Sequence, residues 1–172
     1  MKKLLFIFLT IIGLQGFVTA QQRYAVIDTK YILDKIPEYK DADKRLQSIS
    51  QQWQKEIDDR QELLDKMYKN YEAEQFMLTD ELKKKREDEL FVKEKEVRDL
   101  QKRRFGYEGD LFKERQRLVK PIQDKVYNAI QKLALARSYD FVLDKSEGIT
   151  IIFADPKLDK SDELLKEMGI KF

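Results

Sequence analysis

The stretch from Asp41 to Lys120 constrains the fold most, because its apolar side chains recur every three or four residues among dense Lys, Arg, Glu and Asp. This spacing predicts long helices, since residues three and four apart share one helix face. A stripe this narrow cannot bury itself and needs a facing helix. The stripe comprises Leu46, Ile49, Trp53, Ile57, Leu64, Met67, Tyr71 and Leu78 in the first half, and Leu82, Leu90, Val97, Leu100, Tyr107, Leu111 and Leu118 in the second.

The facing helix is expected to be the other half of the same stretch. The apolar row changes phase between Phe76 and Leu82, and Thr79 there offers a capping hydroxyl followed by two acidic residues. We therefore expect an antiparallel helical hairpin, spanning residues 41–120, with its tip near 76–82. An arm of this length must project from any small domain.

The hairpin register is predicted from the apolar rows. Folding about Thr79 places Trp53 opposite Tyr107 on the returning helix. Gly106 and Gly109 are poor helix formers, at a cost of about 1 kcal/mol each, and we expect them to leave room for the indole.

The N-terminal segment outside the arm predicts a strand and a short helix. The run from Tyr24 to Asp28 is short, apolar and β-branched, as in a strand. Asp28 and Thr29 can then cap a helix that ends at Pro37, where the arm begins.

The C-terminal segment predicts further small elements. Pro121 is expected to kink or break the returning helix. Two strands, residues 141–144 and 149–153, should form a β-hairpin. A final helix should be capped by Ser161 and closed by Gly169.

The fold class is therefore α+β and mostly α, with the arm projecting from a small β-containing body of residues 21–40 and 121–172. So small a core is marginal unless chains associate, and short strands leave edges that another copy can pair with. We expect a homo-oligomer joined through the strands. The candidate oligomerisation residues are Val26, Ile27, Val142, Leu143, Ile151 and Ile152.

Residues 1–20 have the pattern of a secretory signal peptide. Lys2 and Lys3 precede an apolar run from Leu4 to Leu14, and Val18 and Ala20 are the small residues before the expected cleavage point. The run is shorter than the roughly 20 residues of a membrane span, so we expect an exported, soluble product. Removal would leave 32 basic and 32 acidic residues of the 34 and 32 in the whole chain.

Composition excludes several function classes. The sequence contains no cysteine and no histidine, which removes the usual nucleophile–base pairs and the common zinc sites. It also has no Gly-rich phosphate loop. We expect neither an enzyme nor a cofactor or metal site, and the balanced charge argues against a nucleic-acid partner.

Some apolar residues of the arm lie off its main stripe or at its tip. They can contact a partner, or they can widen the hairpin seam or pack against the body; both readings stay open for Phe105 and Phe112. At the tip, an adaptable methionine beside exposed aromatic residues suits promiscuous weak contacts. The candidate partner-binding residues are Tyr68, Phe76, Met77, Leu78, Phe91 and Val92.

The order of these segments resembles the Skp/OmpH family of periplasmic chaperones over essentially the whole mature chain. The resemblance lies in the segments RYAVIDTKYIL and YDFVLDKSEGITIIFADPKLD, with a charged helical hairpin between them. It implies a periplasmic trimer whose arms surround a cavity that holds unfolded outer-membrane β-barrel proteins without ATP. It also implies weak contact with a membrane surface or lipopolysaccharide, although a formally neutral mature chain offers little overall charge for this.

Two rival functions follow from the same residues. A structural coiled-coil spacer of the cell envelope would use the hairpin as a rod and would need a specific binding face at its tip. A membrane-surface binder would use Lys83 to Arg86 with Phe91 and Val92 as a basic amphipathic patch. Acidic residues surround that patch in the sequence.

Overall fold

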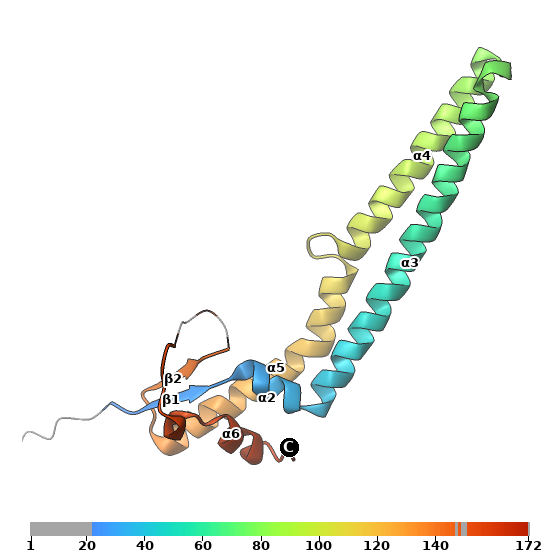
Figure 1. The fold of residues 1–172 in the computed structure, drawn as a ribbon. Coiled ribbons are helices and arrows are strands. Elements are labelled where there is room, and N and C mark those ends of the chain that lie inside the picture. Colours follow the sequence, from blue (N-terminus) through green and yellow to red (C-terminus); the bar gives the residue numbers. More distant parts are fainter. Residues whose placement is uncertain (1–21, 147, 149–150, 172) are drawn as a thin grey trace, which may run out of the picture.

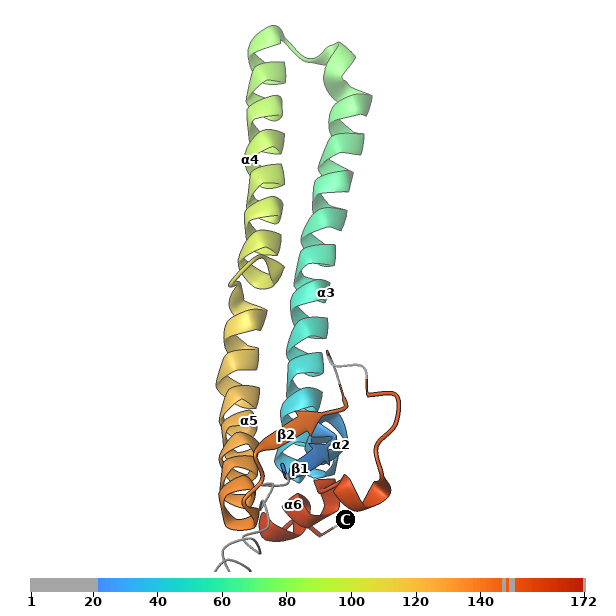
Figure 2. The ribbon, with the colours of Figure 1, turned by 90° about the vertical axis from the view of Figure 1, so that its left-hand side faces the viewer.

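The computed structural model describes residues 22–146, 148 and 151–171. The expected signal peptide, residues 1–20, lies outside the described residues. Two long antiparallel helical segments project from a small body that contains both ends of the described chain (Figures 1 and 2). The predicted class, a helical hairpin on a small β-containing body, is confirmed.

The body begins with strand β1 (Tyr24–Ile27) and helix α2 (Thr29–Lys35). Asp28 caps α2, because its carboxylate accepts a hydrogen bond from the Tyr31 N–H at 2.8 Å. Both elements match the sequence prediction. Helix α3 (Pro37–Glu74) then starts with a proline in its first turn and runs without interruption for 38 residues, roughly 57 Å at 1.5 Å per residue.

The turn at the tip consists of a short 3-10 helix, η1 (Gln75–Met77), and an extended Leu78. Helix α4 (Asp80–Phe105) follows, and the Thr79 hydroxyl accepts from the Leu82 N–H at 3.4 Å. Asp80 and Glu81 occupy the first turn, where their charge favours the helix N-terminus. The predicted Thr79 cap is confirmed.

The returning helix is broken, which the sequence analysis did not predict. Helix α4 ends at Phe105, and helix α5 (Asp110–Arg137) starts after a loop that contains Glu108 at φ 52°. A Cβ on Gly106 would lie 2.3 Å from the Lys102 carbonyl oxygen, so only glycine fits this turn. The loop carries Tyr107 outward, leaving it 95% exposed.

The predicted Trp53–Tyr107 contact is therefore wrong. Trp53 instead packs edge-on against Phe105, with ring centroids 6.5 Å apart. The glycines serve the loop and not the indole, because their backbones approach the end of α4 closely. Pro121 lies inside α5 and does not end it, although the α5 axis bends on its way into the body (Figure 1).

The C-terminal region adds strand β2 (Phe141–Asp144), the 3-10 helix η2 (Pro156–Leu158) and helix α6 (Ser161–Glu167). Strand β2 pairs in parallel with β1, with Tyr24 opposite Phe141 and Ile27 opposite Asp144. The arm is thus the crossover between two parallel neighbours. On its other side β1 accepts a hydrogen bond at the Val26 carbonyl from the Lys160 N–H at 2.8 Å.

Two C-terminal predictions need correction. Residues 151–153 form no strand, and the remainder of the expected strand, residues 149 and 150, lies outside the described residues. Ser161 is the first residue of α6 and not its cap; its buried hydroxyl accepts from the Asp28 N–H at 2.9 Å. Gly169 does close α6, at φ 73°.

The core of the body draws on helices α2, α3, α5 and α6. Its centre is fully buried, and Ile32, Leu164 and Leu165 are each 0% exposed. Ala42, Leu46 and Val119 of this core lie within residues 41–120, the range predicted for the arm. The predicted boundaries between arm and body therefore remain a proposal. The buried cluster comprises Ile27, Ile32, Ile36, Ala42, Leu46, Val119, Ile122, Val126, Leu133, Leu164 and Leu165.

Candidate functional site

The tip of the arm exposes two large apolar side chains. Phe76 and Met77 lie in η1, where the chain leaves α3 and turns toward α4. They are 88% and 80% exposed, and Leu78 beside them is half-buried. Neither Phe76 nor Met77 belongs to a hydrophobic cluster of the described chain. The tip is therefore an apolar surface at the far end of the hairpin.

One flank of the hairpin carries a groove with an apolar floor and charged rims. Its outer part has a volume of about 550 Å³, and Met67 and Val92 contribute its apolar lining. A second hollow of about 210 Å³ shares Met67 and Lys93 with the first and adds Leu63. The rims of the outer part consist of Glu81, Lys84, Lys85, Asp88, Glu89 and Lys93.

The opposite flank presents aromatic side chains beside acidic residues. The Tyr68 hydroxyl donates to the Glu94 carboxylate at 3.5 Å, and the Tyr71 hydroxyl donates to Glu87. The hydrogen bond to Glu87 raises the pKa of Tyr71, so this hydroxyl remains a donor. Phe91, three residues before Glu94, is exposed on the same flank.

The six candidate residues thus divide among three places. Phe76, Met77 and Leu78 lie at the tip, Val92 lines the groove, and Tyr68 and Phe91 lie across the hairpin from it. Met67 also lines the groove, although its place in the apolar stripe predicted that it would be buried between the two helices. Predicting the groove would have required knowing which residues of α3 and α4 lie beside each other.

The basic cluster near the tip is balanced by acidic side chains. Lys83 lies 3.9 Å from the Asp80 carboxylate, and Arg86 lies 3.1 Å from the Glu89 carboxylate. Lys84 and Lys85 share the groove rim with three acids. This arrangement gives no uniform positive face for a membrane or a polyanion.

The candidate oligomerisation residues also separate. Val26 and Ile27 are buried inside the single chain, whereas Val142, Leu143 and Ile151 are partly buried. Ile152 is 95% exposed, and the neighbouring Phe153, absent from the candidate set, is 82% exposed. In the described chain β2 has one partner, β1, so its outer edge is unpaired.

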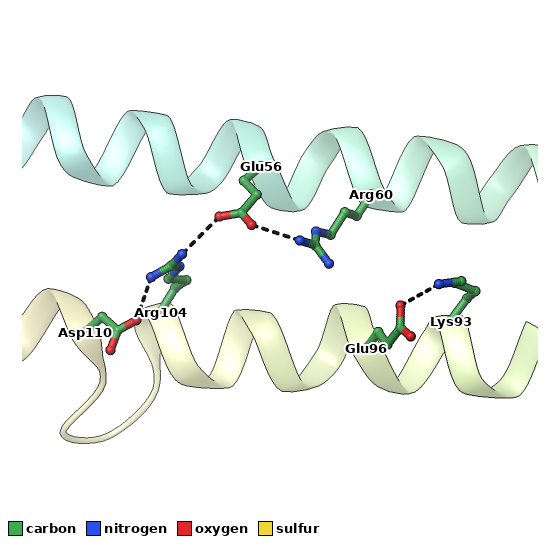
Figure 3. A network of polar contacts seen from close by, with 6 residues as sticks. All are labelled: Glu56, Arg60, Lys93, Glu96, Arg104 and Asp110. Atoms are coloured by element: carbon green, nitrogen blue, oxygen red, sulfur yellow. Dashed lines mark hydrogen bonds and ion pairs between the residues drawn. The ribbon is translucent and has the colours of Figure 1, made fainter.

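The middle of the arm contains a polar network between the two sides of the hairpin (Figure 3). The Arg104 guanidinium bridges Asp110 at 2.8 Å and Glu56 at 3.3 Å. It also lies over the Trp53 ring, 4.7 Å from the centroid. In the sequence alone, Arg104 only interrupts the apolar row of the second half of the arm.

The described residues contain no group of three or more His, Cys, Asp or Glu placed to hold a metal ion. Within that same part of the chain, no helix is both long and apolar enough to cross a membrane.

The chain is similar to known proteins in both sequence and structure. The family model described as "Outer membrane protein (OmpH-like)" matches residues 23–168. A solved structure from Caulobacter crescentus, described as a "putative outer membrane chaperone (OmpH-like)", is similar with a TM-score of 0.67 and 17% identity, over 87% of this chain and 85% of that one. No curated protein sequence matches this chain significantly. Because the family model spans most of the sequence, the chain belongs to the OmpH-like family.

Proposed function

We propose that this protein is an ATP-independent holdase chaperone that binds unfolded outer-membrane β-barrel proteins and keeps them from aggregating. The observation that carries the proposal is the exposed apolar tip, Phe76 and Met77, on a projecting hairpin of an OmpH-like protein. Neighbouring exposed apolar side chains of this size are typical of a surface that contacts a partner. The description of the similar Caulobacter crescentus protein as a "putative outer membrane chaperone" supports the same function.

The arrangement of the arm favours weak and adaptable contacts. Tip, groove and opposite flank each offer a few apolar side chains next to charged ones. Met67 and Met77 can adapt to different side chains. An unfolded chain can therefore be held at many points without adopting one structure.

We propose further that the protein acts as a periplasmic homo-oligomer, with a trimer as the expected order. The edge of β2 that has no partner among the described residues, and the exposed Ile152 and Phe153, support association through the body. Several arms would then enclose a client together, so that each weak contact acts at a high effective concentration.

Suppression of aggregation tests this function. A urea-unfolded outer-membrane β-barrel protein is diluted into buffer with the purified protein, without ATP, and light scattering is followed. A holdase keeps scattering low in proportion to its concentration. A structural spacer would leave the client to aggregate as it does in buffer alone.

A further inference from the structure

The buried apolar residues of the arm form two separate groups. The outer block, residues 57–105, has its own cluster of Ile57, Leu64, Leu90, Val97 and Leu100. The inner block, residues 37–46 and 110–137, belongs to the core of the body through residues such as Leu46 and Val119. On α3 none of the ten residues between Leu46 and Ile57 is buried, a stretch of roughly 15 Å. The seam is therefore discontinuous at mid-arm.

The backbone is interrupted at the same level. Helix α4 ends at Phe105 and α5 begins at Asp110, so the returning side of the hairpin has no helical hydrogen-bond ladder across this loop. Helix α3 alone is continuous there. It contains no glycine or proline between Leu46 and Ile57, so it can bend smoothly but does not break.

The two blocks are joined here by polar contacts. Arg104, the penultimate residue of α4, reaches α3 through Glu56 and α5 through Asp110 (Figure 3). The same guanidinium covers Trp53. Among the described residues no acceptor reaches the buried Nε of Arg104, so the joint is incompletely satisfied. Partly exposed ion pairs hold less firmly than a close-packed apolar seam.

We propose that the arm flexes at this level: the outer block pivots on the inner block about the loop 106–109, and Arg104 is the latch that favours the straight arm. Release of Arg104 from Glu56 or Asp110 leaves the continuous helix α3 and the edge-on contact of Trp53 with Phe105 to resist bending. The inference rests on the packing of a single chain and does not depend on the proposed chaperone function.

Distance measurements between paired spin labels test the pivot. The sequence has no cysteine, so exposed residues can be replaced in pairs without further changes. The pair Lys95→Cys with Gln116→Cys spans the loop. The control pair Lys84→Cys with Arg103→Cys lies within α4 and is roughly 29 Å apart by helical rise. Labelled chains are diluted with excess unlabelled protein, so that only distances within one chain are recorded.

The pivot predicts a broader distance distribution for the spanning pair than for the control pair. Arg104→Gln should broaden the spanning distribution further and leave the control pair unchanged. The matched variant Arg98→Gln removes an ion pair to Glu94 at 2.7 Å inside the outer block, and it should change neither pair. If Arg104→Gln lowers the helix content, Glu56→Gln replaces it as the latch variant.

Two results would overturn the inference. A spanning distribution as narrow as the control, in the parent and in the latch variant, would show one rigid arm. A broad spanning distribution that Arg104→Gln and Glu56→Gln both leave unchanged would remove the latch.

Discussion

The carboxylate of Asp144 accepts two hydrogen bonds from Thr29, one from the backbone N–H at 3.1 Å and one from the hydroxyl at 2.5 Å. It also accepts from the Ser146 N–H at 2.9 Å. These bonds join the end of β2 to the start of α2 across 115 residues of sequence. The small body is therefore held at this point by a polar junction as well as by its apolar core.

Replacement of Asp144 should destabilise the body. Asp144→Asn removes the charge and can place an amide donor against the Thr29 N–H and hydroxyl. We expect a loss of about 1–3 kcal/mol in the free energy of unfolding, the usual cost of leaving such groups unsatisfied. The control is Asp124→Asn, whose carboxylate belongs to an exposed ion pair with Lys120. Urea unfolding, followed by circular dichroism, compares the two variants. Equal urea midpoints would contradict a stabilising role for the Asp144 carboxylate.

Acid should weaken the body through the same junction. Burial opposes ionisation of Asp144, but hydrogen bonds from the Thr29 hydroxyl and from the Ser146 and Thr29 N–H groups outweigh it and lower its pKa. The pKa of Asp159 is also lowered, since bonds from Lys145 and Ser161 outweigh burial. A folded-state pKa below the unfolded value of about 3.9 stabilises the fold above that pH, and this contribution is lost as pH falls through the folded-state pKa.

The free energy of unfolding should therefore fall below about pH 4, and less steeply in Asp144→Asn than in the parent. Urea midpoints measured at several acidic pH values give the two slopes. If both proteins lose stability with the same slope, the Asp144 carboxylate is not the group responsible.

The tip should contribute to client binding through apolar contact. The double variant Phe76→Ser with Met77→Ser should keep the parent's helix content and mass, because neither side chain belongs to a hydrophobic cluster of the described chain. Its suppression of client aggregation should fall. A matched control is Tyr127→Ser, which changes a 60% exposed aromatic residue on α5.

Repeating the aggregation assay at low and high salt distinguishes client binding by apolar contact from client binding by charge attraction. Exposed charges act over roughly 8–10 Å at physiological ionic strength, so neutral substitutions at Lys83 to Arg86 should alter mainly the salt dependence of protection. Full protection by the Ser double variant at both low and high salt would show that other surfaces bind the client.

Oligomerisation should depend on the exposed segment after β2. Ile152 is 95% exposed in the single chain, so Ile152→Asp should leave the fold of the chain intact. If association buries this side chain, the carboxylate costs several kcal/mol and the oligomer should dissociate. Light scattering gives the mass, with Val92→Asp on the arm as the control. An unchanged mass would place the interface elsewhere.

The sequence predicted the elements whose signals are local. Asp28 and Thr79 are followed by helical residues and cap α2 and α4 as expected. The break at 106–109 was missed, because a glycine costs a helix only about 1 kcal/mol and its effect depends on contacts made elsewhere. Here those contacts are the close approaches of Gly106 and Gly109 to carbonyl groups at the end of α4.

The candidate site was predictable only in part, for a similar reason. Exposure of Phe76 and Met77 follows from their place at the turn. The side of the hairpin on which Tyr68 or Val92 lies depends on how the two helices pair. The apolar row of one helix does not define that pairing. The strand expected at 149–153 has no partner in the described chain for residues 151–153, and an apolar run cannot indicate whether its partner is another copy.

Isolation of a complex is the most direct test of the central claim, that this protein holds unfolded outer-membrane proteins in soluble form. A urea-unfolded β-barrel protein is diluted into an excess of the purified protein without ATP, and the mixture is separated by size exclusion with light-scattering detection of mass. The account predicts one soluble peak, whose mass equals that of the oligomer plus one client and in which the client has no β-barrel circular dichroism signal. Recovery of the free oligomer alone, with the client in the aggregate, would contradict it.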